Sequence, residues 1–226
     1  MRRELDRPRA ELCSALADEA RRLGAPEATF RSLAKLEHPS SRVVVTGQQS
    51  GLLLGPAYTL SKAISAIRLA QQLDSEDAPV VPVFWVASQD HDTAEIDHAR
   101  LLDLEERLHT LRLDLPAHVP AGHIPLRNEW LERLAAGMRN ASFVPEHLRE
   151  VEELLGDAWE SADGYADFFT AILYRLLGSE GLIILDPVRP ATAPLFRELI
   201  AKELDQPLAT VRAITAAGEA LGELGE

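Results

Sequence analysis

Hydrophobic residues recur at helical spacing in two parts of the chain. Near the N-terminus, the apolar positions that repeat every three or four residues are Leu12, Leu16, Ala20 and Leu23. A longer repeat comprises Tyr165, Phe168, Phe169, Ile172, Leu173, Leu176 and Leu177. The spacing predicts an N-terminal helix that Gly24-Ala25-Pro26 interrupts. It also predicts an amphipathic helix over 165–177 that packs on a sheet and that Gly178 or Gly181 ends.

Three short apolar runs predict buried strands, and the continuous run Val80–Val86 predicts a strand covered on both faces, as in parallel sheets. These runs are Val43–Val45, Val80–Val86 and Leu182–Leu185. Between the first two, apolar residues at helical spacing predict a helix that begins at Pro56 and ends near Leu73. The order strand, loop, helix, strand is that of a βαβ unit. Pro82 belongs near the start of its strand, because proline cannot donate the hydrogen bond of a fully paired position.

The rest of the chain contains one further expected strand and several helical segments. The strand is expected at Leu108–Leu113, and residues 127–160 have the polar composition of two helices outside the sheet. The expected fold class is therefore α/β, with a parallel sheet. Three regions follow from this reading: an N-terminal helical segment at 1–40, a core at 41–200 with a helical insertion at 115–160, and the start of a C-terminal helical region at 201–226.

Composition and charge narrow the classes of partner. The 226-residue chain has 36 Asp and Glu against 23 Lys and Arg, and its formal charge of −13 argues against nucleic acid as a partner. The single cysteine, Cys13, cannot form an internal disulfide and fits a reducing compartment. The charged N-terminus leads into no apolar stretch of signal-peptide length, and the longest apolar run is too short to span a bilayer. We therefore expect a cytoplasmic protein with no membrane partner.

The loop from Thr46 to Pro56 is the most informative feature of the sequence. Its glycines, Gly47, Gly51 and Gly55, lie between an expected buried strand and a helix N-terminus. Bare backbone N–H groups and the positive end of a helix dipole suit an anionic or nucleotide ligand. The glycine spacing matches neither a Walker A loop nor a dinucleotide fingerprint, and an ordinary turn with structural glycines is an equally good interpretation.

Polar side chains on either side of the glycines favour a binding site over a plain turn. Gln48 and Gln49 each bring a donor and an acceptor, and glutamine is not a favoured turn residue. Tyr58 and Thr59 lie on the first turn of the following helix, close to any ligand that the loop holds. Lys62 lies roughly opposite the apolar face of that helix, where the sequence alone favours a solvated surface lysine.

A second polar cluster, Gln89-Asp90-His91-Asp92, follows the next strand. Ligands of open parallel sheets bind beyond the carboxyl ends of the strands, so both clusters are expected on one rim. His91 is a candidate general base or acid, with Asp90 or Asp92 orienting it or holding Mg²⁺. The alternative is an acidic turn that caps the next helix, with Asp92 at the N-cap and Glu95 three residues later.

Two further acidic positions are weaker candidates. Asp186-Pro187 ends the third expected strand at the same rim, where a ligand contact and a simple turn fit equally well. Asp97-His98 is interpreted as a structural pair.

Taken together, these segments resemble one family. The matching stretches are Thr46-Gly47-Gln48-Gln49-x-Gly51, Gly55-Pro56-x-Tyr58-Thr59-x-x-Lys62-Ala63, Pro82-Val83-Phe84-Trp85, Asp90-His91-Asp92 and Gly181-Leu182-Ile183-Ile184-Leu185-Asp186-Pro187. Over residues 40–200 the chain is similar to the cysteine-adding enzymes of bacillithiol biosynthesis, the BshC family.

The resemblance implies a Rossmann-like core similar to class I nucleotidyltransferases and aminoacyl-tRNA synthetases, with a helical insertion and a C-terminal coiled coil. It implies a ligase that joins L-cysteine to glucosaminyl-malate, the last step in making a low-molecular-weight thiol. The segment from Gly51 to Tyr58 looks like the nucleotide-contacting loop of the synthetases. ATP is a candidate cofactor, because amide formation needs an activated carboxylate, and the coiled coil makes a homodimer the expected assembly.

The chain departs from the pattern of the family in two respects. Gln89 stands where a glutamate is expected, which removes one acidic candidate. Members of the family are much longer, so we expect a fragment or a shortened homologue without the coiled coil, inactive by itself if the missing half completes the pocket. The alternatives are nucleotidyl transfer to another small carboxylate and a non-catalytic, shortened metabolite-binding relative.

Overall fold

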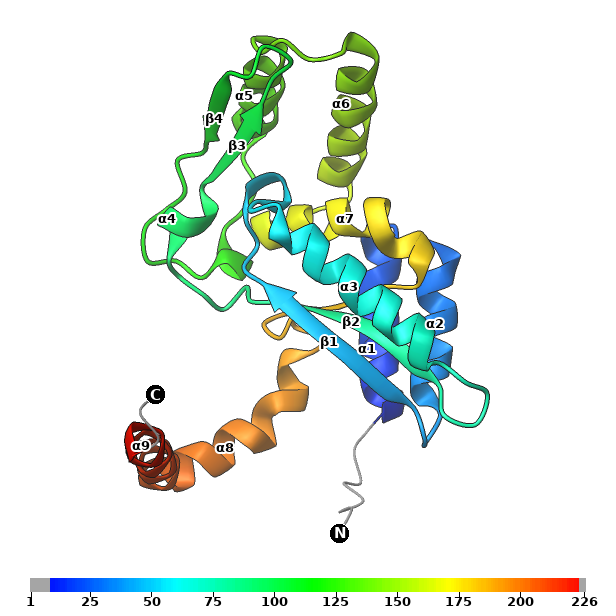
Figure 1. The fold of residues 1–226 in the computed structure, drawn as a ribbon, viewed down its shortest axis with the longest axis vertical. Coiled ribbons are helices and arrows are strands. Elements are labelled where there is room, and N and C mark those ends of the chain that lie inside the picture. The colour runs from blue at the N-terminus through cyan, green and yellow to red at the C-terminus, as the bar shows by residue number, and fades with distance from the viewer. Residues whose placement is uncertain (1–8, 224–226) are drawn as a thin grey trace. The chain divides into compact units, whose positions relative to one another are not determined.

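The computed structural model describes residues 9–223. Residues up to Thr192 form one compact unit, and the chain from Ala193 forms a second. The second unit contains η4 (Ala193–Phe196), α8 (Arg197–Asp205) and α9 (Pro207–Glu223). All the candidate site residues lie in the first unit (Figure 1).

A three-stranded parallel sheet forms the centre of the first unit. Its strands are β1 (Arg42–Gln48), β2 (Val80–Val86) and β5 (Ile183–Leu185), in the order β1-β2-β5. The helix α3 (Tyr58–Leu73) joins β1 to β2, which confirms the predicted βαβ unit and the α/β class. The helix begins two residues later than predicted, after Pro56.

Helices cover both faces of this sheet. In Figure 1, α3 lies in front of the strands, and α1 (Arg9–Arg22) and α2 (Glu27–Glu37) lie behind them. The apolar repeat predicted near the N-terminus is confirmed in α1, where Leu16 and Ala20 are buried. Gly24 separates the two helices with a φ of 73°, a left-handed conformation that favours glycine.

The strand β1 is more exposed than its apolar sequence predicts. Val43 and Val45 are 43% and 55% exposed, whereas their register partners in β2, Val81 and Val83, are buried. The difference arises because α1 and α2 pack on β5 and β2 rather than on β1, which is one of the two edge strands. The expectation of a buried strand is therefore wrong for β1 and confirmed for β5, and β2, which was expected to be covered on both faces, is buried at most of its positions.

Pro82 lies within the central strand, as its third residue. It pairs in register with Val44 of β1, and the pairing of β2 with β5 begins one residue later, at Val83. The proline therefore occupies the part of β2 that precedes its pairing with β5, where a missing N–H costs no hydrogen bond to that strand.

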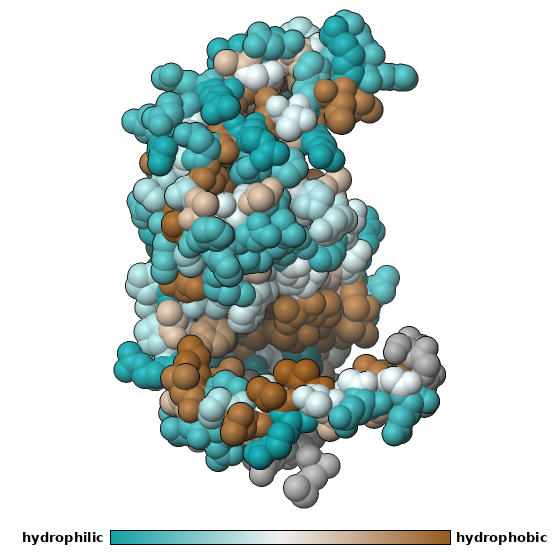
Figure 2. Space-filling model, turned by 90° about the vertical axis from the view of Figure 1, so that its left-hand side faces the viewer, coloured by the Kyte–Doolittle hydropathy of each residue, from teal (hydrophilic) through white to brown (hydrophobic). Residues whose placement is uncertain are grey.

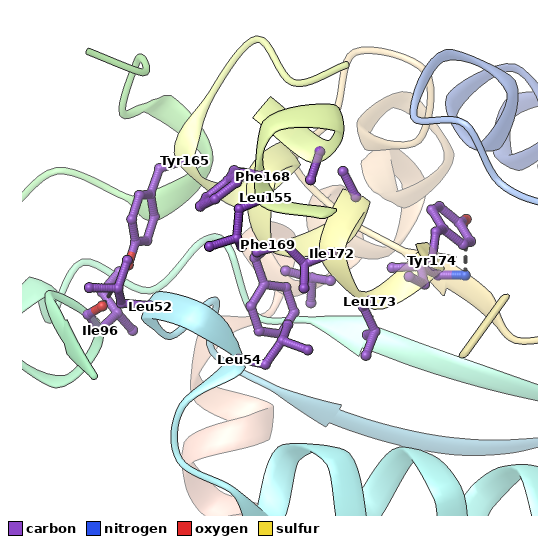
Figure 3. Packing of buried hydrophobic residues seen from close by; sticks show 14 of the residues in the cluster. Leu52, Leu54, Ile96, Leu155, Tyr165, Phe168, Phe169, Ile172, Leu173 and Tyr174 are labelled. Atoms are coloured by element: carbon purple, nitrogen blue, oxygen red, sulfur yellow. Dashed lines mark hydrogen bonds between the residues drawn. The ribbon is translucent and has the colours of Figure 1, made fainter. Parts of the chain in front are cut away.

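The helix α7 (Tyr165–Leu177) runs through the middle of the core. Every residue from Tyr165 to Tyr174 is buried, so the helix is enclosed on all sides rather than amphipathic as predicted. The ring centre of Phe169 lies 6.0 Å from that of Phe84 on β2. Figure 3 shows Phe169 pointing from α7 toward Leu54, which belongs to the same buried cluster. The helix is followed by η3 (Gly178–Glu180).

The residues between β2 and α7 form an inserted region. Its elements are α4 (Thr93–Ile96), β3 (His98–Leu102), β4 (Leu108–Arg112), η2 (Ala121–His123), α5 (Asn128–Arg139) and α6 (Pro145–Glu160). The strands β3 and β4 form a separate antiparallel sheet, so the strand predicted near residue 108 does not join the parallel sheet. As expected for helices outside the sheet, α5 packs on α6 and α6 packs on α7. The surface of the inserted region is mostly hydrophilic in the upper part of Figure 2.

Candidate functional site

The two polar clusters meet at the carboxyl ends of β1 and β2. The last register pair of the two strands is Gln48 with Val86, so both loops leave the sheet at the same edge. Gln49 donates through Nε2 to Asp90 Oδ2 over 2.9 Å, and the same nitrogen donates to the carboxylate of Glu95. The expectation that both clusters share one rim is therefore confirmed.

Lys62 folds back onto the end of β1. Its Nζ donates to Gln48 Oε1 over 2.9 Å and to the Gly47 carbonyl oxygen over 3.2 Å. The ammonium lies 5.1 Å from the ring centre of Tyr58, whose hydroxyl accepts a hydrogen bond of 3.3 Å from Gln48 Nε2. Lys62 is exposed, as expected for a surface lysine, and its ammonium lies at the rim beside Gln48 and Tyr58.

The glycine-rich loop is anchored by apolar side chains. Its centre is a short turn, η1 (Leu52–Leu54), in which Leu52 and Leu54 are buried in the core beneath α7. The backbone N–H of Leu54 donates to Gly51 O, and that of Gly55 donates to Leu52 O. The N–H groups at these positions are therefore not bare, contrary to expectation, but already hydrogen-bonded within the loop. A ligand at this loop would depend more on polar side chains than predicted.

Close backbone contacts account for two of the loop glycines. A Cβ at Gly51 would meet the carbonyl oxygen of Gly55 at 1.9 Å, and a Cβ at Gly47 would meet that of Trp85 at 2.6 Å. Each approach excludes a side chain without any ligand being present. The structural interpretation of these glycines, left open by the sequence, is therefore favoured.

Two buried hydroxyls in the same segment have no hydrogen-bond partner among the described residues. They are Ser50 Oγ, next to Gln49, and Thr59 Oγ1, on the first turn of α3. Both side chains are fully buried. A buried hydroxyl without a partner is uncommon and costly, so these oxygens are suited to bind a water molecule or a ligand atom. Thr46 is half-buried, and Pro56 is exposed at the end of the loop.

Asp90 organises the second cluster through its own carboxylate. Its Oδ1 accepts a hydrogen bond of 3.0 Å from the Asp92 backbone N–H, while Oδ2 accepts from Gln49. These two hydrogen bonds, the first being the larger effect, hold the pKa of Asp90 below its usual value. Asp92 stands at the N-cap of α4 without a side-chain capping bond, and Glu95 bonds Gln49 instead of the backbone. Asp92 therefore occupies the N-cap position, as the alternative interpretation has it, but the two side chains do not form a capping box.

His91 is exposed at the rim. Its ring centre lies 6.4 Å from that of His118, in the inserted region. Within residues 9–223, neither Asp90 nor Asp92 hydrogen-bonds to the imidazole, so the carboxylate expected to orient it does not do so through a direct contact. Gln89 is exposed beside it. Among residues 9–223 as a whole, no group of three or more His, Cys, Asp and Glu side chains is arranged to hold a metal ion.

Asp186 faces the interior of the protein. It is 7% exposed, and its carboxylate accepts hydrogen bonds from the Ser88 hydroxyl and the Val188 N–H, with Arg189 Nε 3.3 Å away. Burial raises the pKa of Asp186. The carboxylate links the ends of β2 and β5 and is not brought next to Gln49 or His91. Asp97 and His98 also pair with each other, at 2.8 Å, in agreement with a structural role.

The structure adds residues to the rim that the sequence did not single out for binding. Glu95 accepts from Gln49 and His118 lies near His91, whereas Ser88 and Arg189 hold Asp186 in the interior, away from the rim. Glu95 had a local signal as an expected capping residue. His118 had none, because it lies in a proline-rich connection and is close to His91 only in the folded chain.

None of the helices within residues 9–223 has both the length and the apolar composition needed to cross a bilayer.

Comparison with known proteins gives a consistent result. Residues 1–225 match the sequence model of the family "Bacillithiol biosynthesis BshC, N-terminal Rossmann-like domain". A Thermus thermophilus protein named "Putative cysteine ligase BshC" is 43% identical over 95% of this chain. Proteins with the same name from Geobacillus thermodenitrificans and Heliobacterium modesticaldum are 36% and 35% identical over 91% and 87% of the chain. The chain spans 40%, 38% and 39% of these relatives.

Proposed function

The chain belongs to the BshC family of bacillithiol biosynthesis as its N-terminal Rossmann-like domain, and on this premise we propose that it takes part in joining L-cysteine to glucosaminyl-malate. The names of the relatives support a ligase, since they are described as cysteine ligases. The observation that carries the proposal is the hydrogen bond from Gln49 to Asp90, because it joins both polar clusters into one rim at the strand ends where parallel sheets bind ligands.

In the proposed reaction, the amino group of glucosaminyl-malate attacks the carboxyl carbon of cysteine. A C–N bond forms, the leaving group on the activated carboxyl departs, and the amine loses a proton. His91 is the proposed acceptor of that proton, because it is exposed at the rim and imidazole exchanges protons near neutral pH. Asp90, whose carboxylate interacts electrostatically with His91, places negative charge beside the ring that would accept the proton.

ATP is the proposed source of carboxylate activation. Lys62 and the unpartnered hydroxyl of Thr59 are suited to phosphate oxygens, because one carries positive charge and the other is a buried donor without an acceptor. Gln48 and Tyr58 would position Lys62 beside such a ligand. When bound, ATP supplies a phosphate or nucleotide leaving group for the cysteine carboxyl.

Mg²⁺ is a second proposed cofactor. Magnesium bound to a nucleotide usually needs only one or two protein carboxylates, with water and phosphate as the other ligands. Asp90 and Asp92 lie on the rim and are the candidate carboxylates, although both oxygens of Asp90 already accept hydrogen bonds. Asp92, which is exposed, is the better placed of the two.

A product assay tests the proposed function. The purified chain is mixed with L-cysteine, glucosaminyl-malate and ATP, and the thiol product is sought by mass spectrometry. We expect a mass equal to that of the two substrates less one water. The Thermus thermophilus relative serves as a positive control for the substrates.

The pattern of results separates the alternatives. Product from the chain supports ligation by this unit, whereas product from the relative alone would show that ligation needs the additional length of the relatives. Release of pyrophosphate with another carboxylate, and none with cysteine and the amine, would favour nucleotidyl transfer. No product from either protein would reject the proposed reaction.

We also propose a cytoplasmic location and a homodimer. Cys13 is a free, buried thiol, which is compatible with a reducing compartment. The dimer is expected through the coiled coil of the family, which lies outside these 226 residues, so its test needs a protein of the relatives' full length. Fluorescence microscopy of a tagged protein and sedimentation equilibrium test these two points.

A further inference from the structure

A chain of buried polar contacts runs from α7 to the turn that follows β2. Asp167 on α7 is buried and pairs with Arg189. The Nε of Arg189 lies 3.3 Å from Oδ2 of Asp186, which is also buried. The other carboxylate oxygen of Asp186 accepts hydrogen bonds from the Ser88 hydroxyl and the Val188 N–H. One arginine therefore joins two buried carboxylates, and the second of these reaches the turn after β2.

Ser88 is a junction between the parallel sheet and the inserted region. Its side chain is fully buried and bonds to Asp186, while its backbone oxygen accepts a hydrogen bond of 2.9 Å from the Gly122 N–H. A Cβ at Gly122 would meet Val188 Cγ2 at 2.5 Å and Ser88 Cβ at 3.3 Å. The glycine therefore permits the inserted loop to approach the segments that follow β2 and β5.

The contacts of Ser88 continue to the rim of the candidate site. Asp90, two residues later, donates from its backbone N–H to Ala87 O over 3.2 Å, which closes a tight turn around Ser88. Its backbone oxygen accepts a hydrogen bond of 3.0 Å from the Ala121 N–H, and its carboxylate accepts one of 2.9 Å from Gln49. A displacement of Ser88 is therefore passed on to Asp90 and to the loop that carries Ala121.

The space beside the buried carboxylates is too small for a substrate. Asp167, Asp186 and Arg189 line a cavity of about 10 Å³, which has room for about one water molecule. A buried carboxylate is costly unless it is paired and hydrogen-bonded, and Arg189 and Ser88 supply these partners to Asp186. A role in holding the two loops therefore suits Asp186 better than the ligand contact that the sequence left open.

We propose that Asp186 is a positioning residue of the candidate site, which fixes Ser88 and thereby holds the turn after β2 against the loop of the inserted region. Its effect on the reaction rests on the proposed function, which places amide formation at this rim. Placement matters there, because a misplacement of about 1 Å can lower a rate by about a hundredfold. The core of the sheet and the inserted region are thus aligned through one buried serine.

Amide hydrogen exchange tests this junction without turnover. Ser88→Ala removes the hydroxyl and keeps the backbone oxygen to which Gly122 bonds. Thr192→Val is the matched control, because Thr192 is also buried and its hydroxyl donates to the backbone oxygen of Asp186 instead of the carboxylate. We expect the N–H groups of Ala121 and Gly122 to exchange about tenfold faster or more in Ser88→Ala. Their exchange in Thr192→Val should match that of the wild type.

Two outcomes of the exchange measurement would overturn the positioning role. Unchanged rates in Ser88→Ala would show that the loops stay together without the hydrogen bond from Ser88 to Asp186. Equal acceleration in Ser88→Ala and Thr192→Val would show that the loss of any buried hydroxyl loosens the loop. The amides of α7 report the stability of the whole unit in each variant, which separates local opening from global unfolding.

A double-mutant cycle in the product assay tests the effect on the reaction. It compares Ser88→Ala, Asp186→Leu and the variant that carries both substitutions. Each single substitution should lower kcat by about tenfold or more. The double variant should lose no more than Asp186→Leu alone, because both substitutions break the same contact. Losses that multiply would mean that the two residues act independently, and Thr192→Val should keep the wild-type kcat.

The results distinguish a failure of the positioning role from a failure of the proposed function. A full kcat in Ser88→Ala, with product from the unsubstituted chain, would reject the positioning role and leave the proposed function standing. If the unsubstituted chain forms no product, or if Asp186→Leu does not fold, the exchange rates of Ser88→Ala decide.

Discussion

Gln49 and Asp90 are 41 positions apart in the sequence and are joined by a hydrogen bond of 2.9 Å at the rim of the sheet. The same amide nitrogen of Gln49 also donates to Glu95. One neutral side chain after β1 therefore holds two carboxylates that follow β2. The shape and charge of the rim depend on this amide, which makes Gln49 the first position to test.

Replacing Gln49 by leucine removes the amide donor and keeps a similar side-chain volume. The pKa of Asp90 is lowered first by the Asp92 N–H and next by Gln49, so it should rise toward its usual value without losing the whole shift. A carboxyl whose pKa is lower in the folded than in the unfolded state stabilises the fold at pH values above its unfolded-state pKa. This stability is lost as the pH falls through the folded-state pKa. The stability difference between wild type and Gln49→Leu should therefore be largest near neutral pH and shrink in acid.

Carboxyl NMR titration and urea unfolding at several pH values measure these two effects. Gln71→Leu is the matched control, because Gln71 donates to Glu180 at 3.2 Å, away from the rim. An unchanged titration of Asp90 in Gln49→Leu would show that the amide does not influence that carboxylate.

Replacing Lys62 by methionine tests phosphate binding at the rim. The substitution removes the positive charge next to Gln48 and Tyr58. We expect the Kd for ATP, measured by calorimetry, to rise about tenfold, the equivalent of one charged hydrogen bond. Arg68→Met is the control, because Arg68 is exposed on the same helix. Equal affinities in the two variants would remove Lys62 from the proposed nucleotide site.

Two glycine-to-alanine substitutions should have opposite effects on stability. Gly51→Ala brings a Cβ to within 1.9 Å of the Gly55 carbonyl oxygen, so the loop must shift, at a cost of about 1–3 kcal/mol. Gly156 lies in α6 with nothing within 4 Å of an added Cβ. Alanine there should stabilise the fold by about 0.5–1 kcal/mol, because glycine in a helix interior is less stable than alanine by that amount. Urea midpoints measure both, and a tolerated Gly51→Ala would mean that the loop relaxes readily.

The buried carboxylate of Asp167 should make Arg22 important for stability. Asp167 is 1% exposed, and both of its oxygens lie 3.0 Å from Arg22. Arg22→Leu should cost about 3 kcal/mol, at the low end for a broken buried pair, because Arg189 still contacts Asp167.

Arg21→Leu provides the matched control one position earlier. Arg21 pairs with Asp18 at 2.8 Å in an exposed ion pair, which should be worth about 0–1 kcal/mol. Chemical unfolding of both variants gives the comparison. Similar losses would mean that the buried pair contributes no more than the exposed one.

The sequence by itself determined the main elements and the position of the two polar clusters. Apolar spacing identified α3 and α7, and continuous apolar runs identified β2 and β5. These features follow from local periodicity, which differs between helices and strands. The common rim of Gln49 and Asp90 also followed, because parallel strands joined by a helix end at the same edge.

Only the tertiary structure decided how these parts are covered and which side chains meet. It left Val45 exposed on an edge strand, turned Asp186 inward to Ser88, and brought His118 to His91. Each outcome depends on the packing of segments that are distant in the sequence. Local patterning reports the preference of a residue for water or for the core, but it does not specify which neighbour the folded chain supplies.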